Sequence, residues 1–137
     1  MKVSGWFQIV IGSGILVAWV LLVASGGVPE ISAGQRDIWF HIAAEATTGV
    51  VLIAAGVLLL RNSSQARVLS AFALGALFYT AVNSPGYYAD RGDWPVVAMF
   101  LMVALASGVL AASLLRPSAF PSEVPMFHEP ESSEVSL

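Results

Sequence analysis

With 137 residues the chain is short enough for one domain, and 57% of its residues are hydrophobic while only 11% are charged. This composition excludes an ordinary water-soluble domain and predicts that lipid surrounds most of the protein. The six basic residues are scattered singly along the chain, which excludes the basic surface needed to bind nucleic acid, and the lack of cysteine excludes disulfides, thiolate metal sites and thiol nucleophiles.

Four apolar segments are long enough to cross a bilayer as helices. We expect Asp37 to cap the second segment, because an aspartate side chain accepts hydrogen bonds from the first N–H groups of a helix. Ser84 precedes Pro85, and the residue before a proline resists helical dihedral angles, so the third segment should end there. The predicted helices cover residues 6–25, 38–60, 68–84 and 94–115.

The composition changes after Arg116. Four prolines interrupt the remaining chain, and four of the nine acidic residues lie in its last fifteen positions. We therefore predict an all-α fold, a four-transmembrane-helix bundle over 1–116 followed by an extended, acidic, Pro/Ser-rich tail over 117–137.

The basic residues indicate an orientation. Lys2, the connection over 61–67 and Arg116 place four of them on one side, against Arg36 and Arg91 on the other. The positive-inside rule then favours both termini in the cytoplasm. We expect a multi-pass protein in the plasma membrane of a prokaryote.

One ionisable pair lies near the start of the second predicted helix. His41 and Glu45 are four residues apart, so both side chains project from one helix face. A carboxylate facing lipid costs several kcal/mol, so Glu45 must face protein, water or a partner group. Tyr79 and Asn83 repeat the same spacing on the third helix at matching depths. We expect the Tyr79 hydroxyl to donate to Glu45, and His41 to reach Asn83.

This cluster has two interpretations. The four residues either form a pocket for a small ligand, a lipid or a proton, or they clasp two helices together by hydrogen bonds. No metal or other cofactor is predicted, since a metal site needs at least three protein ligands and the second histidine, His128, lies in the tail. Ser84 is the nearest candidate nucleophile, and the residues around it do not resemble a nucleophile turn.

Small residues recur on the predicted helices and allow close approach of neighbouring helices. They indicate packing within the chain, with further copies, or with a larger membrane complex. The predicted packing residues are Gly49, Gly56, Ala71, Gly75, Ala104, Gly108 and Ala112.

Two resemblances follow from these segments. The sequence FHIAAE, together with four spans, resembles the sterol-isomerase-like membrane family, in which intramembrane acidic and histidine residues handle a lipid; that activity is not transferred. The longer sequences WFHIAAEATTG and LFYTAVNSPGYYADRGDW resemble uncharacterised four-helix membrane proteins of bacteria and archaea, which implies the topology and no activity.

Three functions are therefore open. The first is a non-catalytic accessory or scaffold subunit that packs through its Gly/Ala helix faces. The second is binding or transport of a small solute, a lipid or a proton through the pocket formed by His41, Glu45, Tyr79 and Asn83. The third is a lipid-modifying membrane enzyme.

Overall fold

The computed structural model describes residues 1–115, apart from the side chain of Tyr87, and within this range it contains helices and no strand. Four helices are long and apolar enough to cross a membrane: α1 (Lys2–Ala24), α3 (Asp37–Leu60), α4 (Ala66–Asn83) and α6 (Trp94–Leu115). Two short helices, α2 (Pro29–Ser32) and α5 (Pro85–Ala89), lie in the connections. The predicted all-α fold is confirmed, and the predicted tail over 117–137 lies outside the described residues.

The local chemistry of the helix ends differs from the prediction in two ways. Arg36, and not Asp37, occupies the N-cap of α3, and Asp37 lies in the first turn, where its charge still complements the helix dipole. The short helices α2 and α5 were not predicted. Each has a proline, Pro29 or Pro85, at its start, where the missing N–H has no helical partner to lose.

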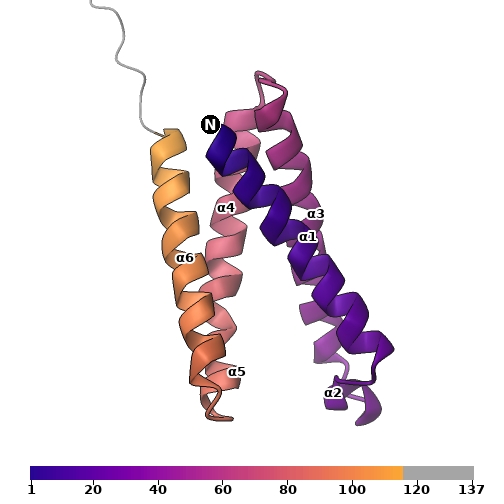
Figure 1. The fold of residues 1–137 in the computed structure, drawn as a ribbon. Coiled ribbons are helices and arrows are strands. Elements are labelled where there is room, and N and C mark those ends of the chain that lie inside the picture. Colours follow the sequence, from indigo (N-terminus) through magenta and orange to yellow (C-terminus); the bar gives the residue numbers. More distant parts are fainter. Residues whose placement is uncertain (116–137) are drawn as a thin grey trace, which may run out of the picture.

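The long helices pack as two pairs, α1 with α3 and α4 with α6, joined where α3 meets α4 (Figure 1). The pairs diverge towards the end of the bundle that carries α2 and α5, called here the α2/α5 end (Figure 1). A buried apolar cluster from α3, α4 and α6, which includes Leu52, Leu59, Leu74 and Leu114, joins the pairs away from that end.

Glycines bring the α1 and α3 backbones into contact. A Cβ atom added to Gly12 would lie 2.6 Å from the Gly49 carbonyl oxygen, and one added to Gly56 would lie 2.6 Å from the Gly5 carbonyl oxygen. These distances leave no room for a side chain. The seven-residue spacing within each helix puts both crossings on one face, so the glycines set the separation of the pair.

The other predicted packing residues divide between inner and outer faces. Ala104 is buried on α6, and a Cβ atom added to Gly108 would lie 3.5 Å from the Phe78 ring. Gly75 faces open space, Ala71 is half-buried and Ala112 is exposed. Gly75 and Ala112 therefore lie on the outer faces of their helices, and Ala71 is only partly covered by the described residues.

Candidate functional site

A cavity of about 610 Å³ lies at the α2/α5 end, and we call it the polar cavity. Side chains from both helix pairs line it: Trp19 from α1, His41 and Glu45 from α3, and Asn83 from α4. The connections supply further lining residues, namely Glu30, Ser84, Tyr88 and Arg91. The site therefore combines the beginning of α3 with the end of α4 and the polar connections beside them.

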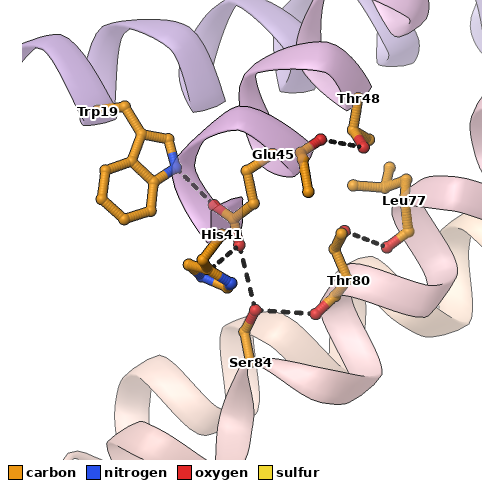
Figure 2. Close-up of polar contacts among 8 residues, drawn as sticks. Trp19, His41, Glu45, Thr48, Leu77, Thr80 and Ser84 are labelled. Carbon is orange, nitrogen blue, oxygen red and sulfur yellow. Dashed lines mark hydrogen bonds and ion pairs between the residues drawn. The ribbon is translucent and has the colours of Figure 1, made fainter. Parts of the chain in front are cut away.

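Glu45 is the centre of this arrangement (Figure 2). Its Oε2 accepts a hydrogen bond of 2.6 Å from Nε1 of Trp19, and its Oε1 lies 3.3 Å from Nε2 of His41. The Glu45 side chain is 16% exposed, whereas that of His41 is 41% exposed. The carboxyl group is thus sheltered by α1 and by its own helix.

Ser84 adds a contact whose direction depends on one proton. Its hydroxyl lies 3.3 Å from Oε1 of Glu45 and 2.9 Å from the Thr80 carbonyl oxygen (Figure 2). A hydroxyl has a single hydrogen, so it donates to one of these oxygens at a time. When it donates to Glu45, it is a second donor to this carboxylate beside the Trp19 indole.

The Trp19 ring also orients His41. The two rings meet edge to face, with centroids 5.8 Å apart and an interplanar angle of 77°. This geometry is favourable between aromatic rings. Trp19 consequently contacts both members of the ionisable pair and holds them against the cavity wall.

An ion pair spans the connections beside the cavity. Arg91 Nη2, in the turn between α5 and α6, lies 3.8 Å from Oε1 of Glu30 in α2. The two side chains are 50% and 20% exposed, so solvent screens the pair and its contribution to stability is small. Its structural effect is to link the two helix pairs at the α2/α5 end.

Tyr88 forms part of the wall contributed by α5. Burial raises the pKa of its phenol above the ordinary value of 10.0, and the negative charges of Glu45 and Asp93 raise the pKa further, against the opposing effect of Arg91. Its ring packs on Phe100 with centroids 5.5 Å apart. Tyr88 therefore remains a neutral phenol at physiological pH.

Three of the four predicted site residues, His41, Glu45 and Asn83, line this one cavity. The predicted hydrogen bond from Tyr79 to Glu45 is wrong, because the Tyr79 side chain is 70% exposed and Glu45 accepts from Trp19 and Ser84. Tyr79 lies two residues from both Leu77 and Ala81, which are buried. At about 100° per residue this places Tyr79 on the opposite side of α4.

The prediction missed Trp19, and it considered Ser84 only as a candidate nucleophile and not as a partner of Glu45, although the sequence carried a signal for each contact. An indole N–H within an apolar helix needs an acceptor, which is a reason to look for a carboxylate near Trp19. Ser84 continues the stripe of Leu77 and Ala81 at helical spacing, so it lies in phase with the inward face of α4.

The donor set favours hydrogen bonding over metal coordination. Within residues 1–115, no three His, Asp or Glu side chains converge as a metal site would require. The carboxylate also lies between His41 and Ser84, whereas a Ser–His–acid triad needs the histidine in the middle. The arrangement can bind a polar group and hold a proton.

The comparisons with known proteins identify a family without an activity. The sequence model for a domain of unknown function, DUF8058, matches residues 1–120. No curated protein and no solved structure matches the chain. With its helices and the polar cavity inside the matched region, the chain belongs to the DUF8058 family.

Proposed function

We propose that this protein is a non-catalytic, multi-pass membrane protein that binds a small ligand in the polar cavity. The observation that carries the proposal is the sheltered Glu45 carboxyl group, held by Trp19 and His41 on the wall of a 610 Å³ cavity. A clasp between helices needs no such space. An ionisable group kept within an apolar bundle marks a functional site by default.

The distribution of charge supports an orientation for this site. Arg36 and Arg91 lie near the α2/α5 end, whereas Lys2, Arg61 and Arg67 lie at the opposite end. The positive-inside rule then puts the termini in the cytoplasm and opens the polar cavity to the outer face of a prokaryotic plasma membrane. The ligand would enter from outside the cell or from the outer leaflet.

Native mass spectrometry of the protein, released from its membrane in a mild detergent, tests ligand binding. We expect the wild-type protein to retain a small molecule that Glu45→Gln and Trp19→Phe release, since the first change removes the acidic group and the second removes the indole N–H that holds it. Tyr79→Phe is the matched control, because that side chain lies outside the cavity. A wild-type protein free of any adduct, or variants that keep it fully, would contradict the proposal.

Packing as an accessory subunit is the second candidate function. The observation in its favour is that Gly75 of α4 faces open space, with half-buried Ala71 one turn before it. Such a surface lets another helix approach closely. Gly75→Leu should then dissociate an oligomer or complex, as measured by native mass spectrometry, whereas Val17→Leu at an exposed position of α1 should not. An unchanged mass in Gly75→Leu excludes this surface.

A further inference from the structure

The charges on the cavity wall have a definite sign. Glu30, Asp37 and Glu45 supply three carboxyl groups, and Arg91 supplies one guanidinium group, which faces Glu30. With Glu45 ionised and His41 neutral the wall carries two excess negative charges, and with His41 protonated as well it still carries one. The sign therefore does not depend on the state of His41, and a bound cation would be favoured over a bound anion.

The aromatic lining adds a second preference. Trp19, Tyr88 and Phe100 all line the cavity, and they come from three different helices. Aromatic faces attract cations, and they do so best for weakly hydrated cations that carry alkyl groups. Leu22, Val28 and Ile38 extend the lining with aliphatic surface. A ligand that fits this wall has a positive centre and an apolar remainder.

The donor set distinguishes between kinds of cation. A divalent metal ion needs several converging oxygen or nitrogen ligands, and the described residues do not bring three together. An ammonium group requires less, because a single carboxylate with neighbouring aromatic rings is enough. Glu45 and Tyr88 both line the cavity, and the Glu45 charge adds to the burial that raises the pKa of the Tyr88 phenol.

We infer that the polar cavity is a binding site for an alkylammonium group, with Glu45 as its counter-ion and Trp19, Tyr88 and Phe100 as the surrounding aromatic wall. This inference rests on the proposed ligand-binding function and names the chemical class of the ligand. The ammonium group can belong to a soluble amine that enters from water or to the headgroup of a lipid.

Fluorescence of Trp19 offers a direct test. In a variant with Trp6, Trp39 and Trp94 replaced by phenylalanine, Trp19 is the single tryptophan and reports on the cavity. We expect octyltrimethylammonium to change its emission saturably in protein held in nanodiscs of neutral lipid, and octyl sulfate to cause no saturable change. Tetramethylammonium is the second probe: saturation by it alone points to a soluble amine, and a need for the octyl chain points to a lipid headgroup.

Substitutions of lining residues test whether the affinity for the ammonium probe depends on the negative charge of the cavity. Glu45→Gln should weaken octyltrimethylammonium binding by about ten-fold or more, while Tyr79→Phe should leave the affinity unchanged. Asp37→Asn, which removes a carboxylate from the wall without touching the Trp19 hydrogen bond, should weaken binding in the same direction.

Three results would overturn the inference. They are equal affinity for octyl sulfate, no saturable response to either ammonium probe, and unchanged affinity in Glu45→Gln. If any of these accompanies a Glu45-dependent adduct in native mass spectrometry, the alkylammonium class is wrong and the ligand-binding proposal stands. If the wild-type protein carries no adduct as well, both fail.

Discussion

Trp19 and Glu45 show how a hydrogen-bond donor from another helix helps to make a carboxyl group tolerable inside an apolar bundle. The 2.6 Å hydrogen bond from Trp19 Nε1 to Glu45 Oε2 joins α1 to α3, and His41 lies next to the other carboxyl oxygen. The need for shelter could be predicted from Glu45 alone, because lipid does not solvate a carboxylate. The identity of the donor could not, since Tyr79, Ser84 and Trp19 all lie at suitable positions along their helices, and only the rotation of each helix decides which one points inward.

Gln8 is a buried residue whose side-chain amide has only part of its hydrogen bonds satisfied. It is fully buried, its Nε2 donates to the Ser4 carbonyl oxygen at 3.2 Å, and its Oε1 has no hydrogen-bond partner among the described residues. Gln8→Met keeps the volume and removes the unsatisfied oxygen, so we expect a gain of about 1 kcal/mol in stability.

Thermal unfolding in detergent measures this gain. Gln65→Met, at an exposed position before α4, should change stability little and serves as the control. A clear loss of stability in Gln8→Met would show that the hydrogen bonds from Nε2 to Ser4 outweigh the cost of the unpaired amide oxygen.

Tyr88 gives a prediction about pH. Its folded-state pKa is raised above the ordinary value of 10.0 by burial and by Glu45, so the folded protein binds the phenolic proton more tightly than the unfolded chain does. The resulting stabilisation is fully present below pH 10 and is lost as the pH rises through the raised pKa. Ultraviolet titration should therefore show that Tyr88→Phe removes a late-titrating tyrosine. If Tyr88→Phe instead removes one that titrates at the ordinary pKa, the burial argument is wrong.

At the scale of elements, the contact between α1 and α3 depends on glycine. Gly12→Ala would place a Cβ atom 2.6 Å from the Gly49 carbonyl oxygen, so the helices must separate and the protein should lose about 1–3 kcal/mol of stability. Gly14, two residues on, has no atom within 4 Å of its Cβ position. Gly14→Ala is thus the matched control.

The same thermal unfolding assay compares the two alanine variants. Gly14→Ala should be neutral or slightly stabilising, because alanine favours helix more than glycine does. Equal stability of Gly12→Ala and Gly14→Ala would mean that the α1–α3 crossing is looser than described.

The helices themselves could be predicted well from the sequence, and their rotations could not. Length and apolar composition define the four long helices, because backbone hydrogen bonds must be satisfied internally in lipid. In a helix that is apolar all round, however, the pattern does not report which face is buried. This is why Tyr79 was assigned inward, whereas the buried side of α4 follows Leu77, Ala81 and Ser84.

At the scale of the whole molecule, two helix pairs share an apolar contact and separate towards the α2/α5 end, where the polar cavity lies (Figure 1). The position of the cavity could be predicted from His41 and Asn83, because both residues lie near the helix ends that meet at the α2/α5 end. The remaining wall of the cavity includes residues of α2 and α5 and the ion pair between Glu30 and Arg91, which joins segments far apart in the sequence. Local sequence patterns carry no information about such pairings.

Chemical labelling of introduced cysteines tests the central claim most directly, since the chain has no cysteine of its own. Ser84 and Ser70 are both buried serines, 8% and 0% exposed, but only Ser84 lines the polar cavity. In intact cells, a membrane-impermeant thiol reagent should label Ser84→Cys and leave Ser70→Cys unlabelled. If Ser84→Cys resists the reagent as Ser70→Cys does, or reacts only after the cells are permeabilised, then no cavity opens to the outer face.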